Sequence, residues 1–364
     1  MTDALSSPCR RRLLGLLASL PILPGRVGRS MAAPSFGISP ALADTPFPDG
    51  ATILVAGPDG GAMDRWAGLL QSALAQSLAP GIVMRQTAAG GADGVTGANQ
   101  FDTRVAPDGR TVLLAPGETV LDWLVGDPRA KFDVGHWVAV MACVTPAVVV
   151  GRSAAFASGG SVRIAAARPA GHDLPAVLGI ELLGGRAELV PLVLDEDALQ
   201  TAFARNAVDA VLLRGHRVPD QAKALVDAGA EPIFALGARD NTGALTRVAQ
   251  FPDVPTLPEL YAQRRGAPPA GPIFDAWCAA AAASQLEFGL VLPQLTPASM
   301  VALWRRAGTD AAGALDVQSP ALALDVRPLG GPAATANTAP VAANEAALLA
   351  LRKWLASRFN WRPA

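Results

Sequence analysis

The stretch that most constrains the fold of this chain is Ala51–Arg65, ATILVAGPDGGAMDR. A β-branched apolar run stops at a Pro-Asp-Gly-Gly turn and a helical pattern follows, which predicts a strand, a glycine loop and a helix. Glycines allow a ligand close to the backbone, and a helix N-terminus presents unpaired N–H groups. Gly60 and Gly61 are therefore candidate anion-binding residues. An ordinary tight turn is the alternative, because the loop lacks a P-loop or dinucleotide motif.

The same pattern recurs twice along the chain. Gly81–Gln86 predicts a second strand and Thr87–Gly97 a second glycine loop, while Thr111–Ala115 predicts a third strand that ends at Pro116-Gly117-Glu118-Thr119. Parallel strands of this kind place their following loops at one edge of the sheet, where open α/β sheets bind ligands. The repeated pattern predicts an α/β fold with the glycine loops gathered at one cleft.

Length and charge narrow the class of protein. The chain has 364 residues, more than one typical domain, so two lobes are expected. Its formal net charge is −1, and no run of Lys or Arg follows the N-terminal region. A nucleic-acid partner is excluded on this ground, because such partners require a basic surface.

The N-terminus has the pattern of an export signal. Arg10, Arg11 and Arg12 precede the apolar run Leu13–Ala18, and Ala41-Leu42-Ala43 is a small-x-small cleavage site. The arginines are typical of a twin-arginine signal, which predicts a periplasmic protein cleaved near Ala43. A general secretory signal and an uncleaved membrane anchor are the alternatives. No later stretch has the roughly 18 uninterrupted apolar residues of a membrane span.

The sequence offers little material for covalent chemistry. It contains no G-x-S-x-G, H-E-x-x-H or Cys-x-x-Cys motif and no clustered metal ligands, so neither a metal nor another cofactor is expected. Cys143 and Cys278 remain after signal removal, either joined in a disulfide or buried as two thiols. A hydrolase that uses His172 and Asp173 with a remote serine is the enzymatic alternative.

Several stretches resemble one family of proteins. Val55–Asp64 (VAGPDGGAMD) is similar to that family's first strand and glycine loop, Ala89–Gly94 to its second loop, and Ala106–Leu114 (APDGRTVLL) to its Ala-Pro-x-Asp-Gly-x-Thr segment. Further similar stretches are Leu124–Val138, Ala207–Leu213, Phe251–Leu257 (FPDVPTL) and Phe288–Pro293. Together they span about residues 51–305 and resemble the periplasmic substrate-binding proteins of tripartite tricarboxylate transporters, the Bug-type solute receptors.

The resemblance implies a two-lobed, type II-like periplasmic-binding-protein fold, in which each lobe is a mostly parallel sheet flanked by helices. It places the signal peptide at residues 1–43, the first lobe at 44–147, the second at 148–287, and the return to the first lobe at 288–364. A ligand would bind in the cleft between the lobes and close them like a hinge. The expected partners are a small molecule and membrane transporter subunits, and the expected state is a monomer.

Candidate ligand residues of the first lobe lie in the predicted glycine loops. Their backbone amides, or a hydroxyl, would face a carboxylate or a bridging water. They are Gly60, Gly61, Gly90, Gly91, Gly117 and Thr119. Asp64 has the wrong sign for an anion site and is interpreted as a first-turn charge that complements the helix dipole.

Candidate ligand residues of the second lobe follow two predicted strands. After the first of these strands the family has a loop rich in Gly, Ser and Thr, and here that loop contains Arg168, Gly171, His172 and Asp173. Arg168 and His172 could donate cationic hydrogen bonds to an anion, and Asp173 could accept one from an amine or hydroxyl. Arg214, after the next strand, is a second candidate carboxylate clamp. Solvated surface charges are the alternative for each.

These features predict a receptor for a small, carboxylated metabolite that does no covalent chemistry. Two acidic features, Asp59 and the triplet Asp195-Glu196-Asp197, are compatible with a ligand that has a positive or neutral part. For the triplet, the alternative is that it caps the helix that follows it. A periplasmic sensor that uses the same fold is a further alternative. The tail, Val341–Phe359, predicts an amphipathic closing helix on the first lobe.

Overall fold

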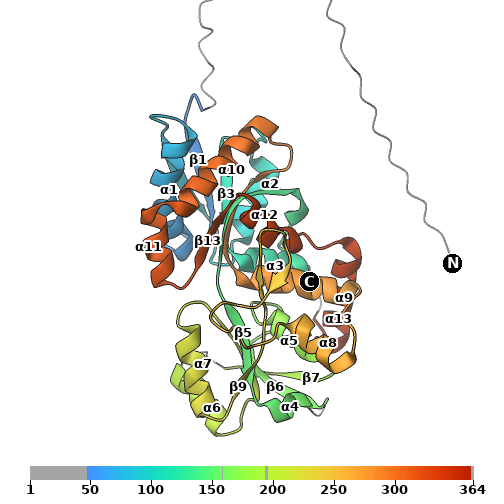
Figure 1. Ribbon diagram of the computed structural model, residues 1–364. Helices are drawn as coiled ribbons and strands as arrows, with labels where there is room; N and C mark the ends of the chain where they lie inside the picture. The colour runs from blue at the N-terminus through green and yellow to red at the C-terminus, as the bar shows by residue number, and fades with distance from the viewer. Residues whose placement is uncertain (1–46, 158, 193–195, 362–364) are drawn as a thin grey trace, which may run out of the picture. The chain divides into compact units, whose positions relative to one another are not determined.

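The computed structural model describes residues 47–157, 159–192 and 196–361. The predicted signal peptide and Asp195 of the acidic triplet lie outside these residues. Two main sheets, each flanked by helices, make up the described chain (Figure 1). The six-stranded sheet belongs to the first lobe and the five-stranded sheet to the second.

The first lobe contains a six-stranded sheet in the order β13-β4-β12-β3-β1-β2. Its strands are β1 (Ala51–Ala56), β2 (Met84–Ala89), β3 (Thr111–Ala115), β4 (Trp137–Val144), β12 (Leu286–Pro293) and β13 (Arg327–Gly330). Its helices are α1 (Ala62–Leu78), α2 (Val95–Arg104), α3 (Gly117–Val125), α10 (Ala298–Gly313), α11 (Leu315–Ala323) and α12 (Gly331–Thr338), with 3-10 turns at Val134–His136 and Ala339–Val341. Strands β1, β2 and β3 run parallel, as the three repeated patterns predict.

Residues alternate between two cores across this sheet. In β1, Ile53 and Val55 pack with helices α1, α10 and α11, whereas Leu54 and Ala56 face the core on the opposite side, beside α2 and α3. The strand is therefore buried on both faces, which explains why it is a continuous apolar run without polar alternation.

The second lobe contains a five-stranded sheet in the order β7-β6-β8-β5-β9. Its strands are β5 (Ala147–Gly151), β6 (Ser161–Ala165), β7 (Arg186–Val190), β8 (Ala210–Arg214) and β9 (Glu231–Ala235), followed by a small hairpin of β10 (Ala238–Arg239) and β11 (Leu245–Thr246). Its helices are α4 (Ser153–Ala157), α5 (Leu174–Leu182), α6 (Glu196–Ala204), α7 (Val218–Asp227) and α8 (Leu257–Arg265).

The predicted two-lobed α/β architecture is confirmed, but its sheets are mixed and not mostly parallel. In the first lobe β12 is antiparallel to both β3 and β4, and β13 is antiparallel to β4. In the second, β5 is antiparallel to β8 and β9. Strands β12 and β5, which lie at crossings between the lobes, run against β3 and β8 of the repeated strand-helix units. Strands β13 and β9 add the remaining antiparallel pairs.

Helix α9 (Pro272–Gln285) links the elements of the two lobes. It packs against α3 of the first lobe, α5 of the second and the C-terminal helix α13 (Glu345–Phe359). Its run of alanines allows these helices to approach, and its buried Trp277 donates an Nε1–H bond of 2.9 Å to the carbonyl of Pro175 in α5. One hydrophobic core therefore continues from the first lobe through α9 into the second.

The C-terminal helix also contacts both lobes. The Asn344 side chain caps it by accepting from the Ala347 amide at 2.8 Å, and its buried face packs on α3 and α9. Near its end, Arg358 donates to the Glu181 carboxylate at 2.9 Å and to the Ala187 carbonyl at 2.6 Å, both in the second lobe. The helix predicted at the tail is present, and it extends beyond the first lobe.

The two cysteines of the described chain are free thiols, so the disulfide alternative does not hold. Cys143 is buried in β4, and burial raises the pKa of both Cys143 and Cys278. Among the described helices, none combines the length and the apolar character that a membrane crossing requires.

Candidate functional site

The first glycine loop satisfies its own amides. The Gly60 N–H donates to the Asp64 carboxylate at 3.0 Å, and the Gly61 N–H donates to the Pro58 carbonyl at 3.0 Å. Gln86 holds the other Asp64 oxygen at 2.9 Å. The anion at the start of α1 is thus supplied by the chain, and a ligand carboxylate on Gly60 would have to displace Asp64. The prediction that Gly60 and Gly61 bind ligand remains a prediction.

The second glycine loop is tied to α3 by Thr119. This fully buried threonine donates its hydroxyl to the Asp93 carbonyl at 2.8 Å. Gly90 and Gly91 lie exposed in the same loop, and Gly90 has a φ of +94°, which favours glycine. Thr119 therefore positions the loop with its hydroxyl, while the backbone of Gly90 and Gly91 remains accessible.

Gly117 has a packing role that the sequence did not indicate. A Cβ atom at this position would lie 2.1 Å from the Ala283 carbonyl oxygen and 2.5 Å from that of Leu286. Only glycine fits where the start of α3 meets the junction of α9 and β12. Gly117 is buried there, so its absence of a side chain is explained by helix packing.

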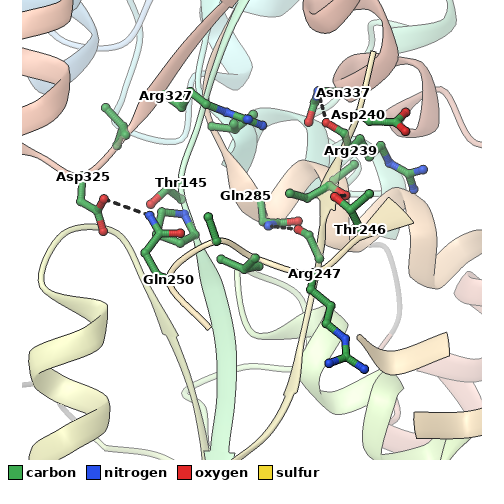
Figure 2. Close-up of a pocket in the computed structure, with 18 residues that line it drawn as sticks. Thr145, Arg239, Asp240, Thr246, Arg247, Gln250, Gln285, Asp325, Arg327 and Asn337 are labelled. Atoms are coloured by element: carbon green, nitrogen blue, oxygen red, sulfur yellow. Dashed lines mark hydrogen bonds between the residues drawn. The ribbon is translucent and has the colours of Figure 1, made fainter. Parts of the chain in front are cut away.

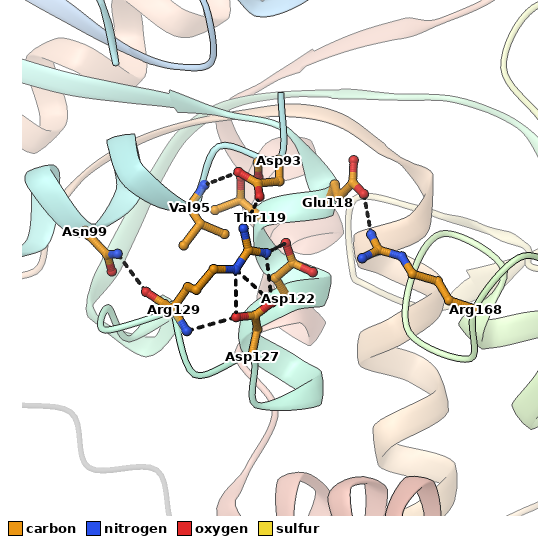
Figure 3. Close-up of polar contacts among 9 residues, drawn as sticks. All are labelled: Asp93, Val95, Asn99, Glu118, Thr119, Asp122, Asp127, Arg129 and Arg168. Atoms are coloured by element: carbon orange, nitrogen blue, oxygen red, sulfur yellow. Dashed lines mark hydrogen bonds and ion pairs between the residues drawn. The ribbon is translucent and has the colours of Figure 1, made fainter. Parts of the chain in front are cut away.

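A cluster of carboxylates surrounds Arg129 beside the second glycine loop (Figure 3). The guanidinium lies 2.6 Å from Asp93, 2.8 Å from Asp127 and 3.8 Å from Asp122. Its hydrogen bonds lower the pKa of Asp127, whereas burial raises the pKa of Asp122 to about 6. Asp122 is the weakly compensated member, because its Oδ2 is buried without a hydrogen bond.

Arg168 joins the two lobes. It lies in the loop between β6 and α5, and its Nη2 is 2.6 Å from Oε1 of Glu118 in α3 (Figure 3). Both side chains are about one third to two fifths exposed, at 43% for Arg168 and 31% for Glu118. The candidate cation of the second lobe is therefore paired with a first-lobe glutamate.

Arg214 repeats this arrangement in a more buried setting. Its Nε donates to the Ser284 carbonyl at 2.9 Å, and its Nη2 is 3.9 Å from Oε2 of Glu287 in β12. Burial lowers the pKa of Arg214, and Glu287 and Asp173 oppose that effect. Arginine remains charged in such surroundings, so a half-buried cation, 24% exposed, faces the first lobe at the end of β8.

His172 and Asp173 lie beside Arg214, and burial sets their charge. Burial and the Arg214 charge lower the pKa of His172 to about 3, so the imidazole is neutral near pH 7. It can form hydrogen bonds there but does not supply the cationic one that its sequence position suggested. Burial raises the pKa of Asp173 to about 6 against the opposing effect of Arg214.

The structure thus brings together the candidates of the second lobe. Ser284 ties their loop to α9 by donating its hydroxyl to the His172 carbonyl at 2.7 Å. Gly171 is buried in this loop beside the Arg168 side chain. The hydrogen bonds described for Gly60 and Gly61 lie within their own loop and α1, so those glycines are not joined to this group.

Sequence reasoning missed three members of this group: Glu118, Ser284 and Glu287. Glu118 stands inside the predicted loop after the third strand, and its position there was the available signal. Ser284 and Glu287 flank the point where the chain returns to the first lobe, a position that only the tertiary structure identifies. Within the described residues, no group of three or more His, Cys, Asp and Glu side chains could hold a metal ion.

No protein-family model matches the chain, and no curated protein matches its sequence. A solved TctC solute-binding protein from Polaromonas, without ligand, aligns over 84% of this chain and 99% of its own, with a TM-score of 0.59 and 16% identity. The chain has this solute-binding-protein fold.

Two further structures align with lower TM-scores. The periplasmic binding protein BugD is 16% identical and covers 85% of this chain and 97% of its own, with a TM-score of 0.47. MatC from Rhodopseudomonas palustris, with bound malate, is 18% identical and covers 84% of this chain and 98% of its own, with a TM-score of 0.45. The fold expected from the sequence resemblance is therefore confirmed by the Polaromonas protein.

Open α/β sheets bind ligands in the crevice outside the carboxyl ends of their strands. Arg168 follows β6 and Arg214 ends β8, so both lie at this edge of the second lobe. Their partners, Glu118 and Glu287, belong to elements of the first lobe. Two arginine–glutamate pairs that cross from one lobe to the other therefore lie at the candidate site.

Proposed function

We propose that this protein is an exported solute receptor of the tripartite tricarboxylate transporter type, which binds a small carboxylate between its lobes. The observation that carries the proposal is the pair of second-lobe guanidiniums at the strand ends, each facing a glutamate of the first lobe. A guanidinium presents donors in the geometry that a carboxylate accepts. A ligand carboxylate would take the place that Glu118 now holds against Arg168.

The remaining assignments belong to the same proposal. The protein is exported to the periplasm, cleaved near Ala43, and works as a monomer that delivers its ligand to membrane transporter subunits. The charged and polar groups of its cleft bind and orient the ligand, and the protein carries out no covalent chemistry on it. The neutral His172 and the Ser284 hydroxyl support the loop that holds Arg168.

The test is a calorimetric and thermal-shift titration of the mature chain, residues 44–364, with mono-, di- and tricarboxylates. A ligand at about 100 times its dissociation constant adds about 2.7 kcal/mol of stability, which a melting curve resolves. Arg214→Gln should weaken the binding of the best-binding carboxylate by about 10-fold or more, because it removes charge-assisted hydrogen bonds at a half-buried position. Arg186→Gln, an exposed arginine of the same lobe, is the matched control.

Glu118→Gln should change carboxylate affinity in the opposite direction from Arg214→Gln. If a ligand carboxylate displaces Glu118 from Arg168, removing the glutamate charge should raise carboxylate affinity by several-fold, about 1 kcal/mol for this half-exposed pair. A wild-type chain that binds none of the carboxylates, or an Arg214→Gln variant with unchanged affinity, would contradict the proposal.

A further inference from the structure

A second cavity lies at the crossing between the lobes. It has a volume of about 410 Å³, within the usual range of small-molecule sites. It is called the hinge pocket here, and its polar lining includes Thr145 at the first crossing, Gln285 at the return crossing and Arg327 at the start of β13 (Figure 2). The hairpin of β10 and β11 closes it from the second lobe.

The hinge pocket is separate from the candidate cleft. In the first-lobe sheet β4 stands between β13 and β12, and in the second-lobe sheet β5 stands between β9 and β8. The continuous crossing from β4 to β5 therefore separates the two sites. Glu287 in β12 and Arg214 in β8 lie on the cleft side, whereas Arg327 in β13 and Gly237 after β9 lie on the side of the hinge pocket.

Four of the charged side chains that line the hinge pocket are already engaged. Arg239 donates to the Gly243 carbonyl at 2.8 Å, and Arg247 lies 3.1 Å from Glu259. The other two are acidic. Asp240 accepts from the Thr242 hydroxyl at 2.7 Å, and Asp325 accepts from the Gln250 amide at 3.1 Å.

Arg327 is the exception. Within the part of the chain that the structure describes, no hydrogen bond or ion pair engages its guanidinium. Its backbone pairs with Val144 of β4, which fixes the root of the side chain at the rim of the pocket. Figure 2 shows this side chain extending over the pocket, with Thr145 and Gln285 beneath it.

The hydroxyl of Thr145 is a second polar group of the hinge pocket lining without a hydrogen-bond partner among the described residues. The residue is 2% exposed, and its hydroxyl oxygen is buried without a hydrogen-bond partner among the described residues. A buried polar group without a partner destabilises a fold by about 1–3 kcal/mol, so a ligand atom that accepted a hydrogen bond from it would offset that cost. Its backbone N–H donates to the Gln285 carbonyl at 2.8 Å, which holds the hydroxyl in position.

We propose that the hinge pocket is a second binding site, for a small organic carboxylate that Arg327 and the Thr145 hydroxyl bind together. A guanidinium and a hydroxyl both donate to carboxylate oxygens, whereas the two acidic side chains of the lining are occupied. Val144, Pro146, Val248 and Ala282 supply apolar walls for the body of the molecule. The volume exceeds that of a simple inorganic anion, so the ligand is organic.

The test uses benzoate as the probe, in calorimetric titrations of the mature chain, residues 44–364. Wild-type protein should bind benzoate below about 10 mM, and benzamide, its neutral counterpart of the same shape, should bind at least 10-fold more weakly. Arg327→Gln should weaken benzoate binding by 10-fold or more. Thr145→Val, which keeps the shape and removes the hydroxyl, should weaken it by several-fold.

Two variants separate this site from the cleft. The surface control Arg186→Gln should bind benzoate as wild type does, and Arg214→Gln, which alters the proposed cleft, should keep the benzoate binding that Arg327→Gln loses. Absence of benzoate binding by wild type, unchanged affinity in Arg327→Gln, or loss of affinity in Arg214→Gln alone would each overturn the hinge-pocket proposal. Melting curves of each variant establish folding, and Thr145→Val carries the test if Arg327→Gln does not fold. Because the cleft titrations depend on Arg214 and these on Arg327, the two proposals fail separately.

Discussion

At the scale of single residues, burial and hydrogen bonding set the charge of His172, Asp122 and Asp127. His172 follows a strand as a cationic ligand residue would, yet burial keeps it neutral. Around Arg129, two carboxylates of the same type behave in opposite ways: Asp127 receives strong hydrogen bonds, and Asp122 is buried with one oxygen that accepts no hydrogen bond. These two residues form a matched pair for measurement.

Asp122→Asn should stabilise the protein by about 1–2 kcal/mol at pH 8. Burial raises the pKa of Asp122 from 3.8 to about 6, so the folded state binds this proton more tightly than the unfolded state does. Stability contributed by the protonated group is therefore lost as pH rises between those values, and the asparagine variant avoids that loss. The gain should disappear below pH 4. Urea unfolding from pH 4 to pH 8 measures it.

Asp127→Asn is the control, and its effect on stability at pH 8 should be opposite to that of Asp122→Asn. Its pKa is lowered by hydrogen bonds from Arg129, so its contribution is present above the ordinary pKa and is lost as pH falls. The variant should be less stable at pH 8 by about 0.5–1 kcal/mol, a small value because Arg129 is 56% exposed. Equal stability changes in the two variants would show that burial does not distinguish these carboxylates.

At the scale of elements, the contact of α3 with α9 fixes the relation between a candidate loop and the crossing helix. The alanines of α9 and the absence of a side chain at Gly117 permit that contact. Sequence reasoning assigned Gly117 to ligand binding because it follows a strand in a glycine-rich pattern. Such patterns do not distinguish a glycine that leaves room for a ligand from one that leaves room for a neighbouring helix, since a side chain would be excluded in both cases.

Gly117→Ala should destabilise the protein by about 1–3 kcal/mol, because the added methyl group would meet two backbone carbonyls that cannot move independently. Gly313→Ala, at the end of α10, is the control: a Cβ there meets no atom within 4 Å, so the change should be neutral or stabilising by up to about 1 kcal/mol. Urea midpoints compare the two. A Gly117→Ala variant as stable as Gly313→Ala would refute the packing role.

At the scale of the whole described chain, the two lobes share one core. The core cluster that contains Leu54 of the first sheet also contains Val149 of the second, and Leu351 of the C-terminal helix. Trp277 and Arg358 add hydrogen bonds that join the elements of the lobes. Separate domains linked by flexible segments lack such continuity, so their unfolding transitions are often separate.

The mature chain, residues 44–364, should therefore unfold in a single calorimetric transition. Its van't Hoff and calorimetric enthalpies should agree, since neither lobe can lose the shared core alone. Differential scanning calorimetry measures this. Two resolved transitions, or a calorimetric enthalpy well above the van't Hoff value, would mean that the lobes fold as independent units.

The sequence by itself determined the repeated strand, loop and helix units and the two-lobed α/β class. These follow from local chemistry: apolar β-branched runs, glycine turns and helical periodicity act within about 15 residues. The third strand, Thr111–Ala115, was predicted at its observed bounds. The second was predicted at Gly81–Gln86 but spans Met84–Ala89, because Gly81 belongs to a turn and the last alanines have little strand propensity of their own.

The tertiary structure alone decided the direction of the crossing strands and the partners of the charged residues. Arg168 is 50 positions from Glu118, and Arg214 is 70 from Ser284, so no local pattern predicts those pairs. The pKa changes of His172 and Asp173 depend on how much chain covers them. Local spacing sets which elements form, but the desolvation and pairing of a charge depend on distant segments, and only the folded chain brings those together.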